Sequence, residues 1–105
     1  MNNNEVVTLY VTYEKTSHYF FDKKYYVDEH IPLVLKSFKP YGLLSAQAFL
    51  PANESGNTVM ICECLFESNQ SIEDSFASKE GELVMDDVKN FTDVEPQRFI
   101  LKKIN

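Results

Sequence analysis

The hydrophobic pattern of the chain alternates between strand-like and helix-like stretches. Four stretches rich in β-branched and aromatic residues predict strands, at residues 6–13, 43–50, 58–66 and 95–103. Two stretches space their apolar residues three or four positions apart and predict helices, over residues 19–38 and, in two pieces, over residues 71–88. The order β-α-β-β-α-β predicts a ferredoxin-like α+β fold, in which the helices pack on one face of a four-stranded antiparallel sheet.

Turn and capping residues mark the ends of these elements. Thr16 or Ser17 is the expected N-cap of the first helix, and Ser71 is expected to open the second. Proline and glycine place a turn at residues 39–42, and residues 51–57 have the composition of a hairpin loop.

Pro32 interrupts the first predicted helix. Proline has no N–H to donate, and its ring clashes with the carbonyl group four residues earlier, that of Asp28. Ile31, directly before the proline, is biased away from the α conformation. We therefore expect the helix to break or kink between Glu29 and Ile31, which places His30 at the break.

The predicted strands are apolar on both faces. In residues 6–13 and 58–66, apolar side chains occupy odd and even positions alike. Helices that cover one face leave the other uncovered, and an exposed apolar face marks an association surface. Because twofold closure is the commonest oligomeric arrangement, we expect a homodimer that buries these faces.

Glu63 is a carboxylate in the middle of the most apolar predicted strand. It either faces a pocket, where it would act with His30 as a second acid–base group, or forms a cross-strand ion pair with Arg98 or Lys102. The ion pair is the favoured interpretation, because charge pairs more often serve structure than catalysis.

The composition predicts one small domain that binds neither nucleic acid nor membrane. With 105 residues, 44% hydrophobic and 25% charged, we expect a single domain over residues 1–105 with an ordered core from about 6 to 103. A formal net charge of −6 repels phosphate backbones and anionic membranes. No apolar run approaches the roughly 20 residues that span a bilayer, and the start lacks signal-peptide features. We therefore expect a cytoplasmic protein.

The sequence contains no recognisable cofactor or metal motif. It lacks the glycine-rich nucleotide-binding patterns, the G-x-S-x-G elbow and the H-E-x-x-H motif. Cys62 and Cys64 fall on one face of a strand, and we expect reduced core thiols rather than a disulfide. His18 and His30 are the two histidines of the chain, and we expect no metal site and no cofactor.

Residues 21–33 resemble the signature of the EthD family, small proteins named for a component of an ethyl tert-butyl ether degradation system. The matching residues are Phe21, Asp22, Tyr25, Tyr26, His30, Pro32 and Leu33. A second block, residues 80–93, is similar to the segment that follows the family's second helix, so the resemblance covers roughly residues 6 to 103. It implies a dimeric α/β barrel, in which two such sheets form a barrel with the helices outside, and an oxidoreductase-type function.

His30 is the first candidate for a catalytic residue. It lies in a structured, aromatic setting, and the ordinary histidine pKa of about 6.5 suits proton transfer at neutral pH. The alternative is a structural histidine that binds the carbonyl groups freed by Pro32. Tyr26, four residues before His30, shares its helix face and is the expected hydrogen-bond donor to a ligand. The expected substrate-binding residues are Phe21, Tyr25 and Glu63.

Two functions fit these residues. The first is a cofactor-independent oxidoreductase, or an isomerase or cyclase, that acts on a small apolar or aromatic molecule with His30 as acid and base. The second is a non-catalytic ligand-binding or accessory protein of a catabolic oxidative system. An enzyme should lose its activity in His30→Ala, whereas a binding protein should retain most of its affinity.

Overall fold

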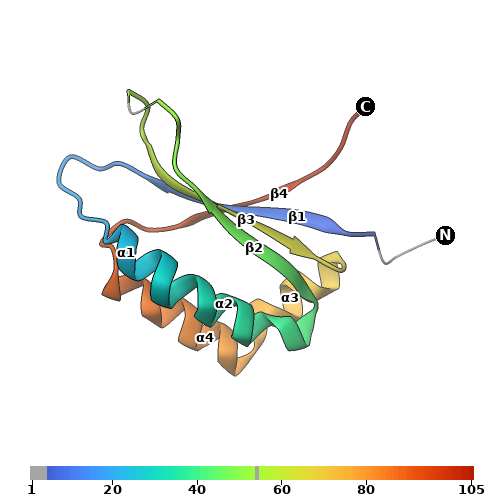
Figure 1. Ribbon diagram of the computed structural model, residues 1–105. Helices are drawn as coiled ribbons and strands as arrows, with labels where there is room; N and C mark the ends of the chain where they lie inside the picture. The colour runs from blue at the N-terminus through green and yellow to red at the C-terminus, as the bar shows by residue number, and fades with distance from the viewer. Residues whose placement is uncertain (1–4, 54) are drawn as a thin grey trace.

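The computed structural model describes residues 5–53 and 55–105 and shows the predicted α+β architecture (Figure 1). Four antiparallel strands form one sheet in the order β2-β3-β1-β4. The strands are β1 (Val7–Glu14), β2 (Leu43–Phe49), β3 (Thr58–Phe66) and β4 (Gln97–Leu101). Their ends lie within two residues of the predicted ends, because the β-branched and aromatic runs are bounded by clear turn signals.

The helices cover one face of this sheet (Figure 1). Both crossover connections combine α-helices with shorter π or 3-10 turns. The first comprises α1 (Lys23–Tyr25), a π-helical turn (Tyr26–His30), α2 (Ile31–Phe38) and a 3-10 turn (Lys39–Tyr41). The second comprises α3 (Asn69–Ala77), α4 (Lys79–Asp86) and a 3-10 turn (Asp87–Asn90). Helices α2 and α4 lie side by side beneath the sheet. None of the described helices is long and apolar enough to cross a membrane.

Both helical segments use different N-caps from the predicted ones. The first is capped by Asp22, whose carboxylate accepts the backbone N–H three residues on at 3.0 Å, and not by Thr16 or Ser17. Helix α3 is capped by Ser68, which accepts the N–H of the predicted opener, Ser71, at 3.2 Å. All of these residue types are good caps, so the sequence alone does not single out the one that the chain uses.

The helix does not break at Pro32 but contains a π turn just before it. Ile31 keeps the α conformation, with φ −60° and ψ −45°, and its N–H bonds to the carbonyl oxygen of Tyr26, five residues back. Pro32 cannot donate to Asp28, and the chain responds by widening one turn of the helix to the π pattern. Such π turns are rare and occur often at functional sites.

The two faces of the sheet differ sharply in exposure. On the helix-facing side, alternate residues of β1 and β3 form the core, and the buried ones are Leu9, Tyr13, Met60, Cys62, Cys64 and Phe66. Both cysteines are free thiols, as expected. None of the described helices packs on the opposite side, and Phe49, Phe99 and Leu101 are 47%, 49% and 47% exposed.

Candidate active site

A cavity of about 200 Å³ lies between the sheet and the helices. Apolar side chains from β1, β3, α2 and α4 make up most of its wall. Five buried side chains with polar atoms share that wall: Tyr13, Tyr26, His30, Cys62 and Cys64. Three exposed lining residues mark its opening: Met85 on α4, Glu95 just before β4, and Arg98 on β4. The cavity therefore presents few polar groups on an apolar surface, which is typical of small-molecule sites.

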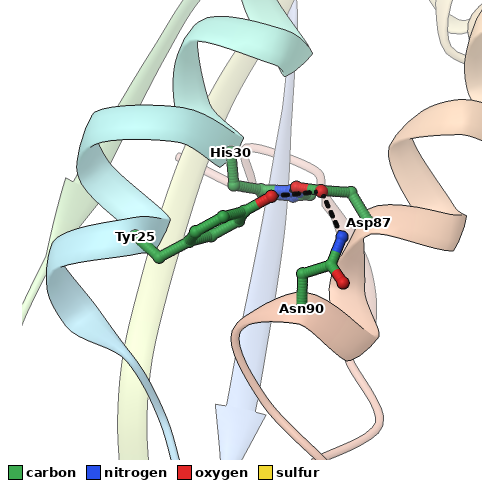
Figure 2. A network of polar contacts seen from close by, with 4 residues as sticks. All are labelled: Tyr25, His30, Asp87 and Asn90. Atoms are coloured by element: carbon green, nitrogen blue, oxygen red, sulfur yellow. Dashed lines mark hydrogen bonds and ion pairs between the residues drawn. The ribbon is translucent and has the colours of Figure 1, made fainter.

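His30 is tied to the second helical segment by a carboxylate. Its Nδ1 lies 2.9 Å from Oδ2 of Asp87, and the imidazole is 4% exposed. The other carboxylate oxygen, Oδ1, accepts hydrogen bonds from the Tyr25 hydroxyl at 2.6 Å and from the Asn90 amide at 2.9 Å. Figure 2 shows Tyr25 and His30 reaching from one helix towards Asp87 and Asn90 on the other. Asp87 thus joins the two helical segments at the edge of the cavity.

The π turn is what brings Tyr25 and His30 to the same carboxylate. Five residues along a regular α-helix correspond to a rotation of about 140°, which would point the two side chains away from each other. In the π pattern, residues five apart come nearly into line, because the backbone hydrogen bond itself spans five residues. The helical distortion at Pro32 and the Asp87 network are therefore parts of one arrangement.

Burial keeps His30 neutral at neutral pH. Desolvation lowers the pKa of the imidazole, and the hydrogen bond and charge of Asp87 offset only part of that shift. Partial burial alone would raise the pKa of Asp87, but hydrogen bonds from Tyr25, Asn90 and His30 outweigh it and hold the pKa of the carboxyl below its ordinary value. The Nδ1–Oδ2 contact is therefore a hydrogen bond from a neutral ring to a carboxylate rather than an ion pair.

This arrangement leaves Nε2 of His30 as the ring nitrogen available to a ligand. With Nδ1–H donated to Asp87, the neutral ring carries its free lone pair on Nε2. His30 lines the cavity, and within the described residues Nε2 neither makes a hydrogen bond nor belongs to the fully buried polar atoms that lack one. A base held in one tautomer by a carboxylate, at the wall of an apolar cavity, is suited to take a proton from a bound molecule.

Tyr26 lies on the cavity wall, as its helix position predicts, but its environment is more apolar than expected. It is 1% exposed, its ring stacks on His30 with a centroid distance of 5.5 Å, and burial raises the pKa of its hydroxyl. The hydroxyl interacts with Cys62 at the floor of the cavity. Tyr26 therefore stays protonated and can only donate or accept a hydrogen bond.

The other three predicted binding residues do not line the cavity. Phe21 belongs to an aromatic cluster in the core, 5.3 Å from the ring of Phe91. Tyr25 stands behind His30, bonded to Asp87. Glu63 lies on the opposite face of the sheet, where its carboxylate accepts the Tyr10 hydroxyl at 3.0 Å.

The predicted ion pair of Glu63 with Arg98 or Lys102 was wrong. Strand β4 pairs with β1 and not with β3, so the final strand lies one strand further away than that prediction required. Arg98 points to the helix side instead, with its guanidinium 4.1 Å from the ring centroid of Phe76.

Asp87 and Asn90 are the site residues that sequence reasoning missed. Asp87 is the C-cap of α4, a position where the helix dipole disfavours a carboxylate. The spacing of Tyr25 and His30 is the sequence feature that could have indicated this partner. It places the two side chains on one face of the helix only if a π turn is assumed at Pro32. Among the described residues, no group of three or more His, Cys, Asp or Glu side chains could hold a metal ion.

Comparison with known proteins supports the fold. No protein-family model and no curated protein matches the chain. Among solved structures, an EthD-like protein from Ralstonia eutropha has a TM-score of 0.79 at 20% identity, covering 94% of this chain and 92% of that one. An EthD family protein from Bacillus halodurans has a TM-score of 0.66 at 20% identity, covering 94% and 99%. A cofactor-independent oxygenase from Streptomyces nogalater has a TM-score of 0.57 at 8% identity, covering 95% and 96%. The chain thus has the ferredoxin-like fold of these small proteins.

Proposed function

We propose that this chain is an EthD-like, cofactor-independent enzyme that moves a proton of a small aromatic or carbonyl-bearing molecule through His30. The observation that carries the proposal is the pairing of a cavity with a buried, neutral histidine held by Asp87 at 2.9 Å. A buried imidazole with a carboxylate behind it is the usual form of a general base. The fold that the chain shares with a cofactor-independent oxygenase is consistent with this chemistry.

The size and lining of the cavity indicate the class of ligand. An apolar cavity of roughly 150 Å³ binds benzene, so a cavity of about 200 Å³ accommodates one substituted ring. Apolar walls bind the ring, and the few polar groups on the wall orient a carbonyl or phenolic oxygen. The substrate we propose is therefore a single-ring or similarly sized molecule with an acidic C–H or O–H proton.

In the proposed mechanism, Nε2 of His30 takes this proton and the imidazole becomes positively charged. Asp87 is ionised and lies against Nδ1, so it stabilises the imidazolium as it forms. If the proton returns to another atom of the substrate, the reaction is an isomerisation or a cyclisation. Reaction of the electron-rich anion with an oxidant gives an oxidoreductase. The chain's own contribution, removal of the proton in a site shielded from water, is common to these outcomes.

Binding is tested first, by thermal shift with a panel of small phenols, quinones, lactones and cyclic ketones. A ligand at about one hundred times its Kd adds about 2.7 kcal/mol to the free energy of unfolding. We expect one chemical class to stabilise the wild type and the matched control His18→Gln, which removes the exposed histidine, and to stabilise His30→Gln less. No shift with any class would contradict the proposed cavity ligand.

Turnover then separates an enzyme from a binding protein. His30→Gln should lower kcat/KM for the stabilising class by about 10²–10⁴-fold, the usual contribution of a general base. In Asp87→Asn the pKa of His30 falls further, because the partner that raises it is weakened. The acid limb of the pH–rate profile should therefore move to lower pH. Unchanged binding in all variants without any turnover would favour the accessory, ligand-binding role.

We also propose that two copies associate through the uncovered face of the sheet. Exposed apolar side chains on β2 and β4, among them Phe49, Phe99 and Leu101, support this proposal. A cytoplasmic location is proposed on the two free thiols, which persist most readily in a reducing compartment.

A further inference from the structure

The floor of the cavity carries a pair of thiols that the proposed proton transfer does not use. Cys62 and Cys64 project from β3 on the helix-facing side, both line the cavity, and their Sγ atoms are 3.6 Å apart. They are 3% and 4% exposed, so the cavity is the route by which a small molecule meets them. A disulfide between them would require two residues on the same face of one strand to come closer together than strand geometry favours.

The two thiols are not equivalent. Cys62 interacts with the Cys64 thiol and also with the Tyr26 hydroxyl, and these two interactions lower the pKa of Cys62 despite its burial. The pKa of Cys64 is raised, first by its hydrogen bond to Cys62 and then by burial. Either sulfur can donate in the contact between the two thiols. Cys62 is the thiol with two hydrogen-bonding neighbours, Cys64 and Tyr26, and both interactions favour its thiolate.

We propose that Cys62 is a covalent attachment site for conjugated carbonyl compounds, such as cyclic enones and quinones, that enter this cavity. The proposal rests on the same cavity as the proposed function but does not depend on turnover by His30. It names the ligand class more narrowly: a ring-sized molecule with a carbon–carbon double bond next to its carbonyl group.

The chemistry is a conjugate addition. Sγ of Cys62 forms a bond to the β carbon of the ligand, and the π electrons of the double bond move towards the carbonyl oxygen to give an enolate. The proton that the thiol loses ends on that enolate, so the product is a neutral thioether. No oxidant, reductant or other reactant is consumed.

The test is labelling of the folded protein with 2-cyclohexen-1-one, followed by intact mass and by tandem mass spectrometry of the peptide that contains both cysteines. We expect one adduct, on Cys62, formed faster than on glutathione in the same tube. Saturated cyclohexanone should give no adduct, and a phenol that the thermal-shift panel identifies as a cavity ligand should slow the labelling.

Two variants test the activation. Tyr26→Phe and Cys64→Ser should each slow the labelling at neutral pH, because each removes an interaction that lowers the pKa of Cys62 and so reduces its thiolate fraction. Leu83→Ala, on the exposed face of α4 and outside the cavity lining, is the matched control and should label like the wild type.

The decisive readout is the wild-type peptide map, so a variant that fails to fold does not remove the test. The proposal is overturned if the folded wild type takes no adduct while the urea-unfolded chain takes two, or if Cys64 is labelled in preference to Cys62. The His30→Gln variant separates this proposal from the proposed function. Labelling that persists there without turnover supports the thiol site alone, and turnover without labelling in the wild type supports His30 alone.

Discussion

At His30, burial and hydrogen bonding act in opposite directions on one imidazole. Burial disfavours the charged ring, whereas Asp87, 2.9 Å away, favours it. Burial is the larger effect, so the folded protein holds the ring neutral. A group whose ordinary pKa is about 6.5 is in this way set to accept a proton at neutral pH rather than to carry one.

The lowered pKa of His30 predicts a loss of stability in mild acid. The unfolded chain binds the proton first, at its ordinary pKa of about 6.5, so the free energy of unfolding falls as the pH drops below that value. The fall continues down to the folded-state pKa, with a limiting slope of about 1.4 kcal/mol per pH unit. Urea unfolding at a series of pH values measures it.

The control for this measurement is the pair of histidine variants. His30→Gln should flatten the profile just below about pH 6.5, where the unfolded imidazole takes up its proton. His18→Gln should keep the loss, because His30 is still present. A profile that is equally steep in His30→Gln would show that other groups cause the acid loss. The carboxyl of Asp87, whose pKa is lowered in the fold, adds stability that is lost only at more acidic pH.

Sequence reasoning at the residue scale found the histidine but not its partner. His30 and Tyr26 could be predicted because they are four residues apart in one helix, and local spacing sufficed to place them on one face. Asp87 is 57 residues away in the chain, and its role depends on how α2 and α4 pack. Glu63 was misplaced for the same reason, because its neighbours were set by the order of the strands.

At the scale of elements, the strands were predictable and the first helix was predictable only in outline. β3 could be read to the residue because its run of apolar and β-branched residues is nearly continuous and a turn-rich loop precedes it. The effect of Pro32 could not be predicted in the same way, because a helix can accommodate a missing N–H by a break, a kink or a widened turn. In this structure the chain adopts the widened turn, and Tyr25 and His30 both contact Asp87 across it.

Gly42, which links the first helical segment to β2, gives a prediction about element connections. Its φ is +109°, and a Cβ at this position would lie 2.3 Å from Oγ of Ser71 on α3. Both backbone strain and steric overlap therefore oppose any other residue. Gly42→Ala should lower the free energy of unfolding by about 1–3 kcal/mol, measured by urea denaturation.

Gly56 provides the matched control for this substitution. A Cβ on Gly56 would meet nothing within 4 Å, and its φ lies outside the left-handed region. Gly56→Ala should leave the stability unchanged or raise it by up to about 1 kcal/mol, because alanine restricts the unfolded chain. Equal losses in both variants would show that the packing of Gly42 against Ser71 does not limit the turn.

At the scale of the whole molecule, the two faces of the sheet have different surroundings. The helix-facing side supplies the core and the cavity, and within residues 5–53 and 55–105 no helix covers the other side (Figure 1). That second side is apolar at its edges, with Phe49 on β2 and Phe99 on β4, and polar at its centre, where Tyr10 bonds to Glu63. An uncovered face of this kind costs solubility unless another surface covers it.

Two adjacent residues of β4 allow a test of the proposed dimer, with one residue as the test position and its neighbour as the control. Phe99 and Ile100 are 49% and 54% exposed, but they lie on opposite faces, because Phe99 stands opposite Tyr10 and Ile100 opposite Leu9. A charge on the uncovered face would be desolvated on association without a partner, which is strongly unfavourable. We therefore expect the wild type and Ile100→Asp to sediment as dimers and Phe99→Asp as a monomer in analytical ultracentrifugation. A monomeric wild type, or a Phe99→Asp variant that dimerises as well as Ile100→Asp, would mean that the uncovered face is not the dimer interface.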